Sequence, residues 1–269
     1  LGLVSFYFLR SLSNPFLRSV PEIAAVIEYP VLGWSKIEPV SDPKSLSAIV
    51  ASMDRLRLSW RTTLAEEKKI IVVTSSTRGD GEHVAAAAFA LSLAKSASKV
   101  LLLDASCDEG ISRLFNLPPG PGLYDYLASG NPDLLTKIIR DVPVQENLKV
   151  IPAGAKPANS GRLESSHYDS LISQLSTESN FVIIATDALN ISLDALALLK
   201  PGVHLLLVAK LNHSLKESLR LAASELTHQK IASSCIYLFG ANNGAAIDHL
   251  PRPVHENNTE GLQEPTAVW

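Results

Sequence analysis

The sequence predicts an α/β fold in which a mostly parallel sheet is covered by helices on both faces. Short runs rich in Val, Ile and Leu recur from Lys69 onward, and segments with helical spacing separate them. Strands that are apolar along their whole length are buried on both faces, which is typical of parallel sheets. Hydrophobic residues make up 46% of the 269 residues and charged ones 19%, so the chain has material for a sizeable core.

The expected elements alternate along the chain, as a parallel sheet requires. The expected strands are 69–76, 99–106, 148–154, 180–186, 203–210 and 233–240. The expected helices are 45–64, 83–97, 166–179, 192–200 and 214–229. Ligands of such sheets bind at the carboxyl ends of the strands. We therefore expect a functional site in the loops that follow Thr74, Asp104 and Ala185.

Charge and cysteine content exclude several classes of function. The net charge is −3 and the pI is near 6.2, so the chain has no basic surface for nucleic acid, and we expect no nucleic-acid partner. Cys107 and Cys235 are isolated from each other, which excludes a disulfide framework and a four-cysteine zinc site. We expect no metal site. The remaining histidines, His213 among them, are scattered and indicate ordinary surface or core positions.

The first 64 residues are interpreted as an arm and a helix, distinct from a domain over residues 65–243. The chain begins with Leu1 and its only methionine is Met53, so we expect a piece of a longer protein. The opening run 1–9 is too short to span a bilayer, which needs about 20 apolar residues. It is either the end of an ordinary helix or the cytoplasmic end of a truncated transmembrane helix, which Arg10 and Arg18 would follow.

Two further segments complete the organisation. Helical spacing after residue 45 places Ile49, Met53, Leu56 and Trp60 on one stripe, which predicts a packing face. The tail over residues 244–269 is polar and contains several prolines, so we expect it to be disordered.

The segment 69–94 has the outline of a phosphate-binding loop, with an apolar strand, a glycine-bearing turn and a helix. A working loop of the form G-x-x-x-x-G-K-[ST] binds phosphates through backbone N–H groups, its lysine and its hydroxyl. Ser76 takes the first glycine position and Gly81 the second, while Glu82 replaces the lysine and His83 the hydroxyl. Gly79 still allows a tight turn. The pattern therefore predicts a P-loop NTPase-like fold.

The charge of this loop is inverted. Glu82 brings a carboxylate to the place of the phosphates, and Asp80 adds a second one nearby. Like charges repel by about 4 kcal/mol at 4 Å and an effective dielectric near 20. On these residues alone, a vestigial nucleotide site and a glycine turn that binds nothing both remain open. A metal site at Glu82 and His83 would need a third ligand, which the neighbouring sequence does not supply.

The order of the segments resembles the cytoplasmic domain of bacterial tyrosine kinases. In many proteobacteria this domain is fused to a polysaccharide co-polymerase, or chain-length determinant, of the inner membrane. The resemblance runs from about Phe8 to Asn242. The pieces that carry it are "FYFLRSLSNPFLRSVPEIAAVIEYPVLG", "DPKSLSAIVASMDRLRLSW", "TSSTRGDGEHVAAAAFALSLA", "KVLLLDASCDEGISRLFNLPPGPGLYDYLASG", "LKVIPAGAKPANSGRL" and "FVIIATDALNISLDALALLKPGVHLLLVAK". The family's loop reads T-S-x-x-P-G-E-G-K-[ST].

The resemblance implies that the catalytic groups are lost at corresponding positions. The second motif, normally D-x-D, keeps Asp104 but has Ser106 at its second carboxylate. The third motif normally ends its strand in aspartate, where this sequence has Ala185. Asp187 lies two residues further on, which makes it a poor substitute. The C-terminal tyrosine cluster of the family is absent, and Tyr237 lies inside an expected strand.

The ring-assembly motif of the family, E-x-x-R-x-x-R, is also eroded. It falls on Ala51, Asp54 and Arg57, so only Arg57 is kept as a remnant.

The resemblance therefore implies a pseudokinase with no catalytic residues and no cofactor, at the cytoplasmic face of the bacterial inner membrane. Its expected partners are components of a polysaccharide polymerisation and export machine, with the membrane reached through upstream helices. The alternative is an atypical tyrosine kinase or ATPase of exopolysaccharide biosynthesis that uses ATP, magnesium and Asp104. A third hypothesis, a chromosome-partitioning-type ATPase, expects a lysine near the loop start, where Thr77 and Arg78 stand.

Overall fold

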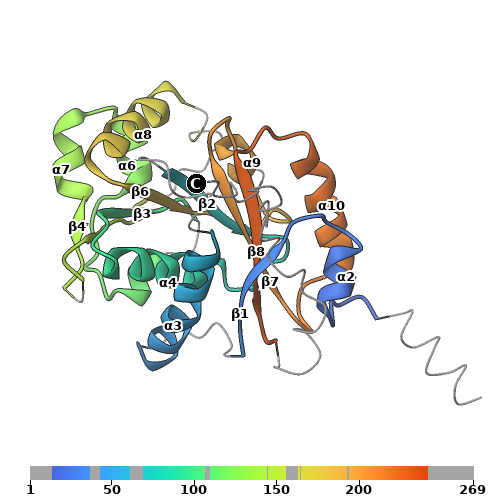
Figure 1. The fold of residues 1–269 in the computed structure, drawn as a ribbon. Helices are drawn as coiled ribbons and strands as arrows, with labels where there is room; N and C mark the ends of the chain where they lie inside the picture. The colour runs from blue at the N-terminus through green and yellow to red at the C-terminus, as the bar shows by residue number, and fades with distance from the viewer. Residues whose placement is uncertain are drawn as a thin grey trace, which may run out of the picture.

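The computed structural model describes residues 14–36, 43–60, 69–106, 110–143, 145–155, 163, 165–192 and 194–241. They form an eight-stranded sheet in the order β1-β8-β7-β2-β6-β3-β5-β4 (Figure 1). The strands are β1 (Val31–Ser35), β2 (Lys69–Ser75), β3 (Val100–Asp104), β4 (Arg140–Asp141), β5 (Leu148–Ile151), β6 (Phe181–Ala185), β7 (His204–Lys210) and β8 (Ser233–Phe239). All neighbouring strands are parallel except β4 and β5. The predicted α/β fold with a mostly parallel sheet is confirmed.

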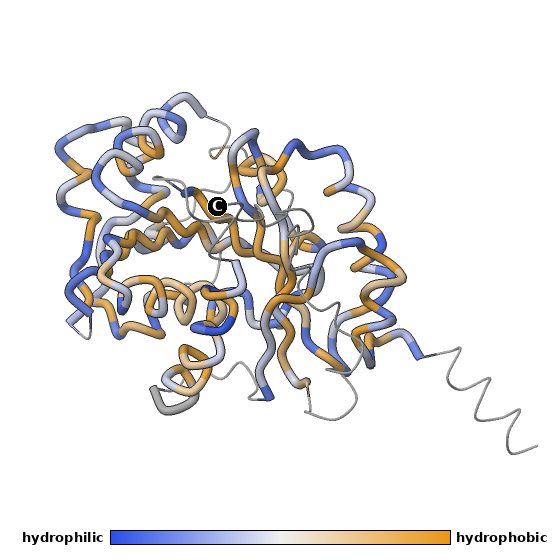
Figure 2. The backbone as a smooth tube through the Cα atoms, viewed as in Figure 1, coloured by the Kyte–Doolittle hydropathy of each residue, from blue (hydrophilic) through white to orange (hydrophobic). Residues whose placement is uncertain are grey.

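Helices cover both faces of this sheet. The helices are α2 (Val20–Ala24), α3 (Pro43–Trp60), α4 (Glu82–Lys95), α5 (Gly110–Leu114), α6 (Leu123–Ser129), α7 (Leu135–Ile138), α8 (Ser166–Glu178), α9 (Asp194–Leu198) and α10 (Lys216–Thr227), with a 3-10 turn at Pro132–Leu134. One core holds the buried residues of α3, α4 and α5, and a second core holds those of α2 and of α6 to α10. Side chains alternate along β2, where Val72 faces the second core and Ile71 and Val73 face the first. Figure 2 shows the hydrophobic strands running through the middle of the molecule.

The predicted arm, residues 1–64, is joined to the sheet of the predicted domain. Its strand β1 pairs with β8 as the edge of the sheet, and the sequence did not predict this strand. The sequence pattern of β1 is weak because Gly33 lies in its interior, and glycine weakens a strand. A Cβ at Gly33 would lie 2.9 Å from the Tyr237 ring, so glycine permits the close approach of β1 to β8.

The helix α3 packs on α4 through the stripe that the sequence predicts. Ile49, Met53 and Leu56 are fully buried, and Trp60 stacks on Phe89 of α4 with 6.2 Å between ring centroids. No helix among the described ranges is long and apolar enough to cross a membrane. The opening run 1–9 and the tail 244–269 lie outside the described residues.

The helix α4 is buried almost all round, which fixes the loop that precedes it. Ala85 to Ala88 have no exposed surface, and their small side chains allow the helix to lie close to the sheet. Because β2 is the central strand that feeds this helix, the connection 76–81 is held at both ends by the core.

Candidate functional site

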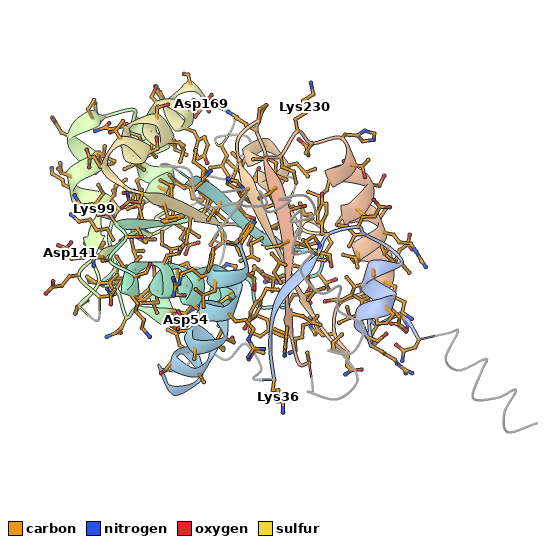
Figure 3. All side chains as sticks on the ribbon, viewed as in Figure 1. Lys36, Asp54, Lys99, Asp141, Asp169 and Lys230 are labelled. Atoms are coloured by element: carbon orange, nitrogen blue, oxygen red, sulfur yellow. The ribbon has the colours of Figure 1, made fainter. Side chains whose placement is uncertain are left out.

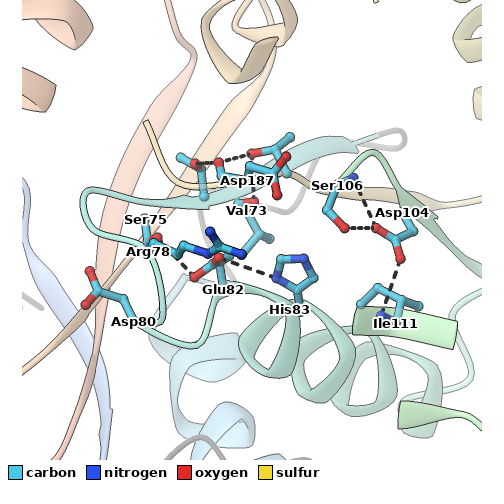
Figure 4. A network of polar contacts seen from close by, with 12 residues as sticks. Val73, Ser75, Arg78, Asp80, Glu82, His83, Asp104, Ser106, Ile111 and Asp187 are labelled. Atoms are coloured by element: carbon cyan, nitrogen blue, oxygen red, sulfur yellow. Dashed lines mark hydrogen bonds and ion pairs between the residues drawn. The ribbon is translucent and has the colours of Figure 1, made fainter. Parts of the chain in front are cut away.

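The loop between β2 and α4 adopts a tight turn that needs its two glycines. Gly79 has φ 86° and Gly81 has φ 97°, both in the left-handed region that favours glycine. Gly81 is the residue before α4 (Figure 4), and Ser76 is 1% exposed, whereas Arg78 and Gly79 of the same turn are exposed. The two glycines therefore form the tight turn that the sequence predicts.

Glu82 lies inside this turn. The residue is 5% exposed, although it begins a helix. The Ser75 hydroxyl donates to Glu82 Oε2 at 3.0 Å, and His83 Nδ1 lies 3.5 Å from Oε1. A negative side chain is stabilised at a helix N-terminus by the partial positive charge of the backbone there. A carboxylate thus sits where the motif would place a lysine.

Asp80 is a second carboxylate, close enough to Glu82 for the charge of Glu82 to act on the pKa of Asp80. Its carboxylate contacts the turn after β7, where Ser214 Oγ donates to Oδ1 at 2.7 Å and His213 Nδ1 lies 3.0 Å from the same oxygen. The Thr77 N–H donates to Oδ2 at 3.2 Å. Figure 4 shows Asp80 on the far side of the loop from His83. Asp80 therefore fastens the loop to the neighbouring turn.

His213 and Ser214 are site residues that sequence reasoning missed. Both follow β7 at its carboxyl end. Polar residues directly after a parallel strand could have been predicted to lie at the site, because sites in such sheets form at the carboxyl ends of strands. Burial raises the pKa of Asp80 to about 6, and the charge of Glu82 acts in the same direction. The hydrogen bonds from His213 and Ser214 and the charge of His213 act to lower it.

The second motif is held by bonds within the chain. Asp104 is fully buried, and its Oδ1 accepts hydrogen bonds from the Ser106 N–H at 3.1 Å and from Ser106 Oγ at 2.5 Å. The Ile111 N–H donates to Oδ2 at 3.3 Å. Burial raises the pKa of Asp104, and the nearby charge of His83 acts to lower it. The carboxylate at the first position of the second motif is therefore directed at the protein.

The third motif contributes only apolar surface. Ala185 is fully buried and pairs with Asp104 across β6 and β3, so the two motif positions are neighbours as predicted. At Asp187 the backbone carbonyl accepts a hydrogen bond from Thr74 Oγ1 at 2.8 Å. Within the described ranges, no group of three His, Cys, Asp or Glu side chains could hold a metal ion.

The His83 ring fills the space beside α5. A Cβ at Gly110 would lie 2.4 Å from His83 Cδ2, so the first residue of α5 is glycine where the ring packs. The imidazole thus lies between the loop and the second motif, in the place that the motif gives to the magnesium-binding hydroxyl. The structure brings Ser76, Glu82, His83, Asp104, Ser106 and Ala185 together at the carboxyl ends of β2, β3 and β6.

Arg57 lies apart from this site, on α3. Its Nε donates to Ser92 Oγ of α4 at 3.3 Å, and Ser92 Oγ donates to Asp54 Oδ1 at 2.6 Å. Asp54, on α3, is labelled in Figure 3. The remnant of the ring-assembly motif therefore makes contacts within its own chain.

Comparison with known proteins places the fold. No protein-family model matches the chain. Tyrosine-protein kinase CpsD of Streptococcus agalactiae is 32% identical over 133 residues, which cover 48% of this chain and 57% of that protein. The chain thus matches little more than half the length of this relative.

Solved structures give a wider match. The kinase domain of the Escherichia coli tyrosine kinase ETK superposes with a TM-score of 0.71 at 21% identity, covering 84% of this chain and 97% of that one. A plasmid partition protein from Borrelia burgdorferi gives a TM-score of 0.50 at 22% identity, covering 64% and 78%. The chain has the fold of the bacterial tyrosine kinase domain, within the wider P-loop NTPase-like class.

The raised pKa of Asp80 predicts a pH dependence of stability. The folded pKa of about 6 lies above the ordinary value of 3.8, so between these pH values the folded chain keeps a proton that the unfolded chain has lost. The contribution of this residue to stability is therefore largest at low pH and falls as the pH rises through 6. Relative to Asp80→Asn, the natural chain should lose on the order of 2–3 kcal/mol over this range.

Urea unfolding at a series of pH values measures this difference. Asp141→Asn, at a side chain that is 89% exposed, is the control and should show no such trend. A difference between the natural chain and Asp80→Asn that stays constant with pH would contradict the assignment.

The packing of His83 against Gly110 predicts an energetic coupling. Gly110→Ala should destabilise the fold by about 1–3 kcal/mol, because the added methyl group overlaps the His83 ring. In a His83→Ala background the same change should cost much less, because the ring is gone.

Chemical unfolding of the single and double variants gives the coupling energy. Gly202→Ala is the control, since a Cβ at Gly202 meets nothing within 4 Å, and it should not couple to His83→Ala. Additive effects of Gly110→Ala and His83→Ala would show that the two residues do not pack together.

Proposed function

We propose that this chain is a non-catalytic, pseudokinase cytoplasmic domain of an inner-membrane polysaccharide co-polymerase. It acts in exopolysaccharide biosynthesis, chain-length control and export by contacts with other proteins. One observation carries the proposal: a buried carboxylate and an imidazole, from Glu82 and His83, stand in contact at the two positions where the resembled loop has its lysine and its hydroxyl.

The chemistry of phosphoryl transfer supports this proposal. Catalysis depends on positioning and on stabilisation of the transferring phosphoryl group by lysine and magnesium. Here a buried carboxylate replaces the lysine, and Ser106 and Ala185 replace two carboxylates. A phosphate near Glu82 would meet repulsion of about 4 kcal/mol at 4 Å and an effective dielectric near 20.

The environment of Tyr237, a possible acceptor of a phosphoryl group, also supports the proposal. Tyr237 is fully buried on β8 and its hydroxyl bonds to Ser52 of α3. Burial raises the pKa of this phenol to about 12, although its hydrogen bonds act to lower it. A phenol in this environment is neither accessible nor ready to lose its proton to a base.

A second candidate is an ATP-binding tyrosine kinase or ATPase of exopolysaccharide biosynthesis. The name of the relative CpsD favours it, as do the retained glycine turn and Asp104. The two candidates differ in whether the natural chain binds Mg·ATP.

Calorimetric titration with Mg·ATP separates them. The natural chain should show neither binding nor turnover, because Glu82 repels phosphate and no lysine attracts it. The variant Glu82→Lys with His83→Thr restores the two motif residues and should bind more tightly than the natural chain.

Glu225→Lys is the matched control, because it makes the same charge change at an exposed site on α10. Glu225→Lys should bind Mg·ATP no more tightly than the natural chain does. Micromolar binding of Mg·ATP by the natural chain would overturn the pseudokinase proposal.

The contacts of Arg57 predict that this chain does not assemble into rings by itself. Arg57 and Asp54 bond with Ser92 inside the chain, and Ala51 has replaced the first glutamate of the motif. Light scattering should give a mass near 28.9 kDa at all accessible concentrations.

Arg57→Ala serves as the comparison for this measurement and should remain at the same mass. A stable assembly of the natural chain that Arg57→Ala dissolves would contradict the prediction.

A further inference from the structure

An apolar cleft of about 400 Å³ lies where α3, α4 and α5 meet the segment that follows β4. Figure 1 shows α3 and α4 side by side, and the last turns of α4 form one wall of the cleft. Its apolar lining includes Leu46, Val50, Leu91, Leu114, Phe115 and Val142. Because α4 has 14 residues, its two ends lie about 20 Å apart. The cleft is therefore separate from the loop that precedes α4.

The walls of the cleft belong to the core that α3 and α4 share, and they are partly open to solvent. Val50, Leu91 and Val142 are 2%, 7% and 3% exposed, while Leu114 and Phe115 are half-buried and pack against the same core. Small-molecule sites are mostly apolar clefts of about 300 to 1,000 Å³. Three helices and the segment after β4 enclose this one. Its size, lining and shape thus favour a compact apolar ligand.

The charge at this cleft has a single sign. Among the described residues that line it, Lys95 is the one charged side chain, and Ser47, Asn116 and Gln145 are the polar ones. Lys95 is exposed at the end of α4, and within the described part of the chain it forms no ion pair. The cleft therefore offers one cation beside an apolar interior, which complements a ligand with an apolar body and an anionic head.

The end of α4 is capped without the Lys95 ammonium group. A lysine in the last turn of a helix often compensates the free carbonyl groups there. Here the Leu93 carbonyl accepts from the Ser96 N–H at 3.0 Å and from Ser96 Oγ at 2.7 Å. The Ala94 carbonyl accepts from Gln145 Nε2 at 3.1 Å. Because these carbonyls have other donors, the ammonium group is available to an anion.

We propose that this cleft binds a single-chain amphiphile, with its hydrocarbon tail among the apolar walls and its anionic head at Lys95. Removing the tail and the walls from water drives such binding, and the cation selects the sign of the head group. A medium-chain carboxylate, decanoate, is the probe. The inference goes beyond the proposed function, because the cleft shares no lining residue with the loop or with the second and third motifs.

Calorimetry and carbon-13 methyl NMR of the whole chain test the inference, with every probe below its micelle concentration. Decanoate should bind saturably and shift the methyl resonances of Val50, Leu91 and Leu114. Each buried methylene group strengthens binding about fourfold, so decanoate should bind about fifteenfold more tightly than octanoate. Decyltrimethylammonium has a tail of the same length and the opposite charge, and it should bind more weakly than decanoate.

Charge reversal at the cleft separates specific binding from general surfactant adsorption. Lys95→Glu should weaken decanoate binding at least about twofold and strengthen decyltrimethylammonium binding, because the sign of the exposed charge is reversed. Lys230→Glu makes the same charge change at an exposed position outside the cleft and is the matched control, which should change neither affinity (Figure 3). Leu114→Trp narrows the cleft and should weaken both probes. If Leu114→Trp does not fold, Lys95→Glu against Lys230→Glu decides the comparison.

Equal affinities of octanoate and decanoate, or equal effects of Lys95→Glu and Lys230→Glu, would overturn the inference. The other possible occupant is a second copy of this chain, which light scattering detects. A dimer of the natural chain that decanoate dissociates would show an interface between copies and would also overturn the inference. These outcomes leave the proposed function untouched, because the titration with Mg·ATP tests that function separately.

Discussion

The burial of one carboxylate at the start of α4 constrains the rest of the site. Glu82 is nine-tenths enclosed between Ser75 and His83, and a charge in such a place requires compensation. His83 supplies part of it and lies close enough to Asp104 to act on its pKa. Gly110 in turn leaves room for the His83 ring. Glu82 and His83 of the loop are thus physically linked to Asp104 of the second motif.

Under the proposed function, the same linkage explains how the fold persists without the groups that phosphoryl transfer needs. A site for phosphate and magnesium gathers negative charge that the ligands neutralise, and an empty site of this kind is strained by repulsion. Here Ser106 and Ala185 remove two carboxylates, and Asp104 is satisfied by Ser106 and the Ile111 N–H. The strand ends can therefore stay packed together with no bound nucleotide.

Sequence reasoning recovered the central strands because their apolar runs carry a strong signal, and the convergence of Asp104, Ser106 and Ala185 followed from the parallel sheet. It missed β1, whose glycine reflects packing against Tyr237, a contact between segments far apart in the sequence. It did not predict the partners that Asp80 finds across the fold. The direction of that side chain depends on His213 and Ser214, which only the folded chain brings within reach.

We propose that Glu82 and His83 keep nucleotide out of the loop between β2 and α4. Nitrogen-15 NMR of the Gly79 and Gly81 amides during titration with Mg·ATP tests this claim at the loop itself. The account predicts that both resonances stay in place at millimolar nucleotide, apart from the small shifts that added salt produces. Saturable shifts of these two amides, with a common dissociation constant, would contradict it.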